Sequence, residues 1–233
     1  MRKESGIFFD SANLIDFKKW FDTGILGGAT TNPVILQKDG VFNIPEHIEK
    51  MVEICGNGFP ISIEVPDSNM NKEEMVTLAL VYTKMFPTNA VIKIPMDPRD
   101  MPKALGVMTK LKGLVKINAT LGLTAGQLIG AMETGAEYVS LFWGRCDEAG
   151  RDGAASTLKT VMKYRETHNL DSKIIIGSIR KVEQIDEAFV LGADIVTIPP
   201  KLIEEWMFTQ RCVETADQFN QAYRDVQDKV TLI

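Results

Sequence analysis

The sequence predicts an α/β fold, a closed (β/α)8 barrel that forms a single domain over residues 1–233. Eight short runs rich in β-branched and aromatic residues alternate with stretches of helical periodicity, which is typical of β/α units and a parallel sheet. The length of 233 residues is close to the roughly 250 of a single-domain barrel, and no linker or low-complexity stretch divides the chain. Polar residues also follow several strands at their carboxyl ends, where such barrels place their sites.

The expected strands lie between turn residues such as Gly27, Gly28 and Pro33, and Gly135 and Gly192 each follow a helix. Helical periodicity covers residues 72–84, 100–111, 124–134, 154–167, 182–191 and 202–207. The strands are expected at residues 7–10, 26–30, 61–65, 91–95, 114–118, 138–142, 173–178 and 194–198.

Residues 208–233 are expected to form a helical extension beyond the eight units. An amphipathic helix is predicted near residues 213–230, with apolar side chains at helical spacing: Val213, Ala216, Phe219, Tyr223 and Val226. A barrel needs only eight helices, so this one is expected either to cap the barrel or to pack on a neighbouring chain.

Composition excludes several classes of function. The net charge of −5 disfavours binding to nucleic acid or to an anionic membrane, and no apolar run approaches the ~20 residues of a membrane span. Three scattered cysteines without a Cys-x-x-Cys motif fit reduced thiols and a cytoplasmic protein. With only His47 and His168 available, we expect neither a histidine-based metal site nor a histidine-based triad.

Lys93 lies in the run Ala90-Val91-Ile92-Lys93-Ile94-Pro95, which otherwise reads as a buried strand. Lysine is seldom fully buried without a partner, and burial in an apolar wall disfavours the charged form of an amine. A neutral amine in a pocket is a nucleophile toward carbonyl carbons, with which it forms a Schiff base. Alternatively, Lys93 lies at the strand mouth and its ammonium reaches water. Lys116 is a rival nucleophile on the next strand. It alternates in step with Asn118 and Thr120, so all three side chains can point inward.

Two carboxylates are placed to assist such an amine. Asp10 ends the first strand, where it is either a general base at the barrel mouth or the N-cap of the following helix. Strand alternation places Ser62 and Glu64 on one face of the third strand. We expect Glu64 to point inward near the lysine, although a salt bridge at a sheet edge is the alternative.

An anion site is expected after the sixth and seventh strands. Gly177 allows a ligand to approach the backbone, and Ser178 and Arg180 follow it at the start of a helix. Arg145 follows the neighbouring strand and is placed to join them. Barrels often bind phosphate with the loops after strands seven and eight, although both arginines are equally suited to surface salt bridges. The tryptophans Trp20, Trp143 and Trp206 are expected to be packing residues.

Together these segments resemble the transaldolase family, which includes fructose-6-phosphate aldolases. The resemblance runs from about residue 7 to residue 200, in the family's order. The motif Thr30-Thr31-Asn32-Pro33 is specific, and the whole series is more specific still. The segments that carry it are Asp10-Ser11-Ala12-Asn13, Gly28-Ala29-Thr30-Thr31-Asn32-Pro33, Glu64, Ile92-Lys93-Ile94-Pro95, Asn118-Ala119-Thr120, Gly135-Ala136-Glu137-Tyr138-Val139-Ser140, Phe142, Arg145 and Gly177-Ser178-Ile179-Arg180.

The resemblance implies a role for each of these residues. Lys93 would form the Schiff base, Asp10 would deprotonate the hydroxyl whose loss breaks the carbon–carbon bond, and Glu64 and Thr120 would hold the water that carries protons. The dihydroxyacetone end of a ketose phosphate would bind Asn32, Asn118 and Ser140, and the phosphate would bind Arg145, Ser178 and Arg180. Such an enamine mechanism needs neither a metal nor an organic cofactor.

Glu64 and Phe142 resemble transaldolases, whereas the aldolases tend to carry Gln and Tyr at these positions. A tyrosine hydroxyl is suited to protonate the enamine and release dihydroxyacetone, and phenylalanine is not. Two departures from the family pattern are the segment after Lys93, which contains Arg99, and the bulky Trp143. We therefore expect Arg99 to add to the anion subsite, for a sulfo-sugar or for an unusual phosphosugar. A lysine at Lys116 is also outside the pattern and has no assigned role.

The sequence thus predicts a cytoplasmic class I transaldolase of the pentose phosphate route, acting on sugar phosphates. An aldolase that releases free dihydroxyacetone is the nearest alternative, and a barrel that binds phosphosugars without catalysis is a third reading. Small members of the family form rings in which the final helix reaches a neighbour, so the resemblance implies a homo-oligomer, a pentamer or a decamer.

Overall fold

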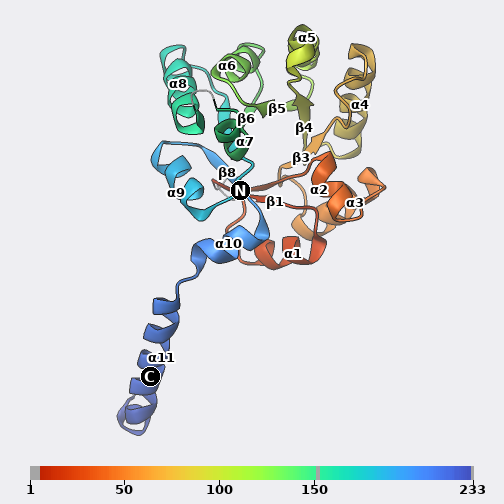
Figure 1. Ribbon diagram of the computed structural model, residues 1–233. Coiled ribbons are helices and arrows are strands. Elements are labelled where there is room, and N and C mark those ends of the chain that lie inside the picture. The colour runs from red at the N-terminus through yellow and green to blue at the C-terminus, as the bar shows by residue number, and fades with distance from the viewer. Residues whose placement is uncertain (1–5, 151–152, 232–233) are drawn as a thin grey trace.

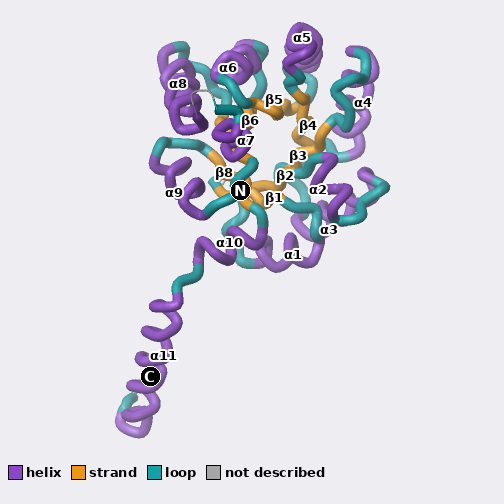
Figure 2. Tube along the Cα trace, viewed as in Figure 1, coloured by secondary structure: helices purple, strands orange, loops and turns teal. Residues whose placement is uncertain are grey.

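A closed barrel of eight parallel strands forms the centre of the molecule, because β1 pairs with β8 as well as with β2. The computed structural model describes residues 6–150 and 153–231, and within these ranges the predicted (β/α)8 barrel is confirmed. Figure 2 shows the strands as an inner ring and the helices around it. The strands are β1 (Ile7–Asp10), β2 (Gly28–Thr30), β3 (Ile61–Glu64), β4 (Ala90–Pro95), β5 (Lys116–Gly122), β6 (Tyr138–Phe142), β7 (Lys173–Gly177) and β8 (Ile195–Ile198).

Helices cover the outside of the barrel (Figure 1), and short ones follow β2, β4 and β6. Among the short helices are α2 (Pro33–Lys38), α7 (Trp143–Glu148) and the 3-10 turn η1 (Pro98–Asp100). The others are α1 (Leu14–Asp22), α3 (Ile44–Cys55), α4 (Lys72–Met85), α5 (Met101–Leu111), α6 (Ala125–Glu133), α8 (Gly153–Thr167), α9 (Val182–Val190), α10 (Pro200–Met207), α11 (Gln210–Val226) and the 3-10 turn η2 (Gln227–Lys229).

The fifth strand differs most from its expected range of 114–118. Leu114 is 62% exposed and lies outside the sheet, and β5 starts at Lys116 and continues to Gly122. The pairing of β5 with β6 shifts register between Ala119 and Gly122, and Leu121 within this shift has a left-handed φ of 65°. This irregularity adds one residue to β5 relative to β6. Because β5 continues to Gly122, Asn118 lies within the strand rather than at its end.

An apolar plug fills the lower interior of the barrel. Its members come from five different strands and are at most 6% exposed: Phe8, Val91, Tyr138, Ile175 and Ile195. The much larger core lies between the strands and the surrounding helices. Because side chains alternate along a strand, residues two positions after the plug also point inward, one layer nearer the carboxyl ends.

Gly28 shows how tightly this plug is packed. A Cβ atom at position 28 would lie 2.5 Å from the Phe8 ring, well inside contact distance. The second strand can therefore lie against the phenylalanine only if position 28 lacks a side chain.

Helix α11 is separate from the barrel. It projects away from the strands and the other helices (Figure 1), and none of its residues is buried. The expected extension over 208–233 thus contains a helix, but it does not cap this barrel; residues 232 and 233 lie outside the described ranges. In the parts of the chain that are described, no helix is long and apolar enough to cross a membrane.

Candidate active site

A cavity of about 140 Å³ opens directly above the apolar plug. Five of its lining residues each follow a plug residue by two positions, so strand alternation alone points them into the barrel: Asp10, Lys93, Ser140, Gly177 and Thr197. The remaining lining residues are Thr30, Asn32, Val34, Phe142, Arg145 and Ser178. They lie between the middle of a strand and the loop that follows its carboxyl end, the side on which barrels of this kind place their chemistry.

Lys93 points into this cavity and is only 3% exposed. Its Nζ donates a hydrogen bond to the carbonyl oxygen of Thr31 at 2.7 Å and lies 2.9 Å from Glu64 Oε2. Glu64 and Lys93 are paired residues on the neighbouring strands β3 and β4, so the sheet register itself brings amine and carboxylate together. The alternatives of a solvent-reaching lysine and an edge salt bridge are therefore wrong.

On β3 and β5, the strands on either side of β4, two side-chain oxygen atoms are buried without a hydrogen-bond partner among the described residues. They are Thr120 Oγ1 and, apart from its ion pair, Glu64 Oε2. Buried polar atoms are nearly always hydrogen-bonded to protein or to water, so unsatisfied oxygens indicate a position that a polar ligand or a water occupies. Neither residue is among those that line the cavity.

Asp10 faces the cavity from the end of β1. Its Oδ1 accepts a hydrogen bond from Thr30 Oγ1 at 2.8 Å, and Thr30 Oγ1 also lies 2.5 Å from Thr197 Oγ1. Burial raises the pKa of Asp10 above its ordinary value of 3.8, and this outweighs the Thr30 hydrogen bond and the positive charges of Lys93 and Arg145, which lower it. A raised pKa makes a carboxylate a better proton acceptor.

Asp10 does not cap the helix that follows it. Asn13 performs that role, because its side-chain oxygen accepts hydrogen bonds from the backbone N–H groups of Ile15 and Asp16. The loop between them is tied to the end of α2, since Asp39 Oδ2 accepts from Ser11 Oγ at 3.2 Å and from the Ala12 N–H at 3.0 Å. The Asp10 carboxylate is thus left free for chemistry at the mouth.

A hydrogen-bond chain supports the opposite wall. Ser140 Oγ donates to Asn118 Oδ1 at 2.7 Å, and Asn118 Nδ2 donates to Ser62 Oγ at 3.2 Å. Asn118 is fully buried and does not line the cavity, although it was expected to contact the ligand. In this arrangement it orients Ser140, which does line the cavity.

The rim of the cavity at β6 and β7 carries the features of an anion site. Arg145 lies 5.3 Å from the centre of the Phe142 ring, and both side chains line the cavity. Ser178 has a left-handed φ of 56°, a conformation that is strained for a residue with a side chain and is often found at ligand sites. Arg180 is different: it does not line the cavity, and its guanidinium is bonded to Glu148.

The remaining candidates lie away from the cavity. Lys116 is exposed at the amino end of β5, opposite Val91 of the plug. Arg99 donates to Asp97 at 2.9 Å from an exposed side chain and does not line the cavity, so the geometry gives no support to an anion subsite there. Trp143 is buried in the main core, as a packing residue.

Sequence reasoning missed three lining residues, Thr30, Val34 and Thr197. The sequence did contain a signal for Thr197. After Asp194 at its start, the predicted strand at residues 194–198 has Thr197 as its one polar residue. Thr30 was quoted as part of a motif and received no role. Val34 follows Pro33 at the start of α2, where nothing in the sequence alone indicates that a side chain turns toward the mouth.

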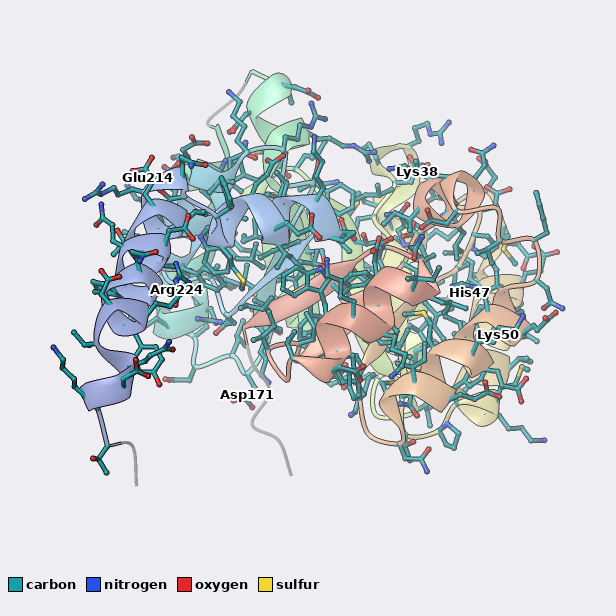
Figure 3. The ribbon with its side chains drawn as sticks, turned by 90° about the horizontal axis from the view of Figure 1, so that it is seen from below. Lys38, His47, Lys50, Asp171, Glu214 and Arg224 are labelled. Carbon is teal, nitrogen blue, oxygen red and sulfur yellow. The ribbon has the colours of Figure 1, made fainter. Side chains whose placement is uncertain are left out.

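A second, larger hollow lies outside the barrel, between the β1–α1 loop and α3. It measures about 650 Å³ and is an open groove that reaches neither Asp10 nor Lys93. Figure 3 places its residues Lys38, His47 and Lys50 on the side of the molecule away from α11. We take the smaller cavity as the candidate active site because it contains the reactive groups. Among the described residues no group of three His, Cys, Asp or Glu side chains is arranged to hold a metal ion.

The fold and the cavity define a (β/α)8 barrel with an amine and two carboxylates at the carboxyl ends of its strands. The family model described as Transaldolase/Fructose-6-phosphate aldolase matches residues 7–231. The chain belongs to this family and is a transaldolase-family enzyme.

Curated relatives agree over most of the chain. A "Probable transaldolase" of Exiguobacterium sp. is 33% identical over 95% of this chain and 99% of its own length, and one of Brachyspira hyodysenteriae is 34% identical over 94% and 97%. "Probable transaldolase 2" of Bacillus cereus is 37% identical over 85% and 88%. Among solved structures a mandelate oxidase has a TM-score of 0.56 at 9% identity, covering 84% of this chain and 65% of that one, which is a likeness of fold alone.

The raised pKa of Asp10 predicts how stability depends on pH. A carboxyl group whose pKa is raised in the folded state costs stability above that pKa, and the cost disappears as pH falls toward the unfolded value of 3.8. Asp10→Asn keeps an oxygen that can accept from Thr30 and removes the charge. We expect a larger free energy of unfolding than wild type at pH 7, measured by urea denaturation, and an advantage that shrinks on acidification below the raised pKa. An advantage that grows toward low pH would contradict this account.

Proposed function

We propose that this protein is a class I transaldolase, in which Lys93 forms a Schiff base with a ketose phosphate and a dihydroxyacetone unit passes to an aldose phosphate. The observation that carries the proposal is the buried Lys93–Glu64 pair at 2.9 Å, whose lysine lines the same cavity as Asp10. Family membership and the names of the relatives support the reaction class. Replacement of a buried ion pair by apolar residues of similar size is often neutral or stabilising, so stability alone does not account for such a pair in an apolar strand.

The first half of the reaction attaches the donor. Glu64 accepts a proton from the Lys93 ammonium, and the free amine attacks the ketose carbonyl carbon to give a carbinolamine. Glu64 then returns the proton to the departing hydroxyl, and water leaves as the imine forms. The unsatisfied oxygens of Glu64 and Thr120 suit a water molecule that relays these protons.

The second half breaks and remakes a carbon–carbon bond. Asp10 removes the proton from the donor hydroxyl next to the scissile bond, an aldehyde leaves, and the electron pair of the broken bond is held as an enamine on Lys93. An acceptor aldehyde takes the same place, the bond re-forms, and Asp10 returns its proton to the new hydroxyl. Hydrolysis of the imine releases the product and restores the amine.

The wall and the rim divide substrate binding. Asn32 and Ser140, the latter oriented by Asn118, are placed for the hydroxyl groups of the three-carbon unit. Arg145 and Ser178 are placed for the phosphate or for another anionic tail, such as the sulfonate of a sulfo-sugar. Each of these side chains can donate a hydrogen bond to a substrate oxygen. Such a bond is stronger when the donor or the oxygen is charged.

Phe142 favours transfer over release. Its ring lines the cavity and carries no hydroxyl that could protonate the enamine, so the intermediate persists until an acceptor arrives. An aldolase that releases dihydroxyacetone remains the second candidate function within the same family. We further propose a cytoplasmic enzyme of the non-oxidative pentose phosphate route.

A homo-oligomeric ring, a pentamer or a decamer, would give α11 a partner. The helix carries exposed apolar side chains on one face, among them Phe219 at 71% and Tyr223 at 44%, and it contacts little of its own barrel. Figure 3 shows Glu214 and Arg224 along this helix, on the side of the molecule opposite Lys38.

Borohydride trapping tests the nucleophile. Incubation with fructose 6-phosphate and borohydride should leave a stable adduct on the peptide that contains Lys93, detected by mass spectrometry. Lys93→Met should lose the adduct and at least about 10³-fold in activity, because the covalent step has no substitute. The matched control is Lys116→Met, which removes an exposed lysine from the next strand and should keep both. An adduct on Lys116 would overturn the assignment, and no adduct on any lysine would favour binding without catalysis.

Product analysis separates transfer from release. Wild type should form little free dihydroxyacetone when no acceptor aldehyde is present. Phe142→Tyr should raise this release severalfold, because a phenol at position 142 can protonate the enamine. Phe142→Leu, which removes the ring and adds no hydroxyl, is the control and should not raise it. Rapid release by wild type would make the protein an aldolase.

Light scattering tests the assembly. The full chain should have a mass several times 25.9 kDa, and Phe219→Glu should lower it because a charge would enter an apolar contact. Gln221→Glu adds the same charge two residues away, on another face of α11, and should leave the mass unchanged. A wild-type monomer would refute the ring.

A further inference from the structure

Arg180, an expected phosphate ligand on the loop after β7, is already paired with a carboxylate. Its Nη2 donates to Glu148 Oε2 at 3.0 Å, and its Nη1 contacts the other carboxylate oxygen. Both terminal nitrogens of the guanidinium are thus engaged by one carboxylate. Glu148 lies at the end of α7, on the segment that follows β6. Arg145 and Ser178 line the cavity, and Arg180 does not.

Gly144 makes this position of Arg180 possible. A Cβ atom at position 144 would lie 2.8 Å from Arg180 Nε, 2.9 Å from its Cδ and 2.7 Å from the carbonyl oxygen of Ser178. The arginine side chain therefore lies across the bare backbone of α7. Because residues four apart share one face of a helix, Glu148 is the next side chain that the guanidinium meets beyond Gly144.

The same backbone contact connects this pair to the cavity. The Gly144 N–H donates to the Ser178 carbonyl at 3.1 Å, and Ser178 lines the cavity in its left-handed conformation. Arg180 is thus two residues from a cavity-lining group and on the same loop. Glu148 and an anion at the rim are two negative groups that compete for one guanidinium.

The Arg180–Glu148 pair is weak enough to exchange. The two side chains are 47% and 58% exposed, and ion pairs with such access to water contribute only about 0–1 kcal/mol. A phosphate dianion carries more charge than a carboxylate and offers more acceptor oxygens, and it is bound bidentately by arginine. A ligand at the rim can therefore draw Arg180 from Glu148.

We propose that Glu148 is a specificity-determining residue that holds Arg180 away from the cavity until an anionic substrate displaces it. The inference rests on the proposed function, in which the phosphate end of the sugar lies at this rim. In this arrangement Arg145 provides a constant positive charge and Arg180 a conditional one. Glu148 lowers the affinity for any small anion and leaves binding of an uncharged three-carbon unit unaffected.

The test measures phosphate affinity directly. Glu148→Gln removes the competing charge and keeps the size of the side chain. We expect the dissociation constant of inorganic phosphate, measured by calorimetry, and the KM for fructose 6-phosphate to fall by up to about fivefold, the ratio that corresponds to a surface pair of about 1 kcal/mol. The KM for unphosphorylated fructose should not change. Glu166→Gln, which breaks an exposed pair with Lys163 on α8, is the matched control for net charge and should change none of these values.

The double variant decides whether the effect acts through Arg180. In an Arg180→Gln background, Glu148→Gln should no longer tighten phosphate binding. A shift that persists there, an unchanged affinity in the single variant, or a weaker affinity would each overturn the proposal. Trapping of dihydroxyacetone on Lys93 by borohydride tests the proposed function separately, because it involves no phosphate. If trapping is normal and Glu148→Gln leaves the phosphate affinity unchanged, only the role of Glu148 is refuted. If trapping is absent and Glu148→Gln still tightens phosphate binding, only the transaldolase mechanism is refuted.

Discussion

The buried ion pair between Lys93 and Glu64 is the interaction on which the rest of the candidate site depends. An ammonium and a carboxylate enclosed by protein lose their hydration, and their mutual attraction recovers that cost only when the geometry is good. Here the geometry follows from the sheet, because the two residues are register partners on adjacent parallel strands. Apolar residues of similar size would be expected to serve stability at least as well. The pair therefore makes physical sense as a device for moving protons beside a nucleophile, and less sense as a structural brace.

The apolar plug in the barrel interior lies one layer below this pair. Phe8, Val91 and their three partners seal the lower interior, and the reactive residues follow them two positions later on the same strands. One alternation rule thus builds both layers. Gly28 lies so close to the Phe8 ring that a side chain at position 28 would overlap it, so the packing of this apolar layer is tight at that point. Burial of this kind raises the pKa of Asp10, so the apolar layer also adjusts the base of the reactive layer.

Much of this arrangement could be predicted from sequence, because it follows from local pattern. The strand order, the inward direction of Lys93 and Glu64, and the family all depend on alternation and on motifs with fixed spacing. The range of β5 could not be predicted, because the strand continues to Gly122 through a register shift between Ala119 and Gly122, which side-chain alternation does not reveal. The partner of Arg180 was equally hidden, since Glu148 is 32 residues away and meets it only through the packing of α7 on the β7 loop.

The groups proposed for bond making and the groups proposed for substrate selectivity lie on different kinds of element. The groups proposed for bond making lie on or directly after strands β1, β3, β4 and β5, whose positions are fixed by backbone hydrogen bonds on both sides. The groups that would meet the anionic end lie on α7 and on the loop before α9, where side-chain contacts alone decide which way an arginine points. A change at Gly144 or Glu148 can redirect Arg180 without moving any strand residue. Substrate preference can therefore vary at this rim while the lysine, its carboxylate partner and the base stay in place.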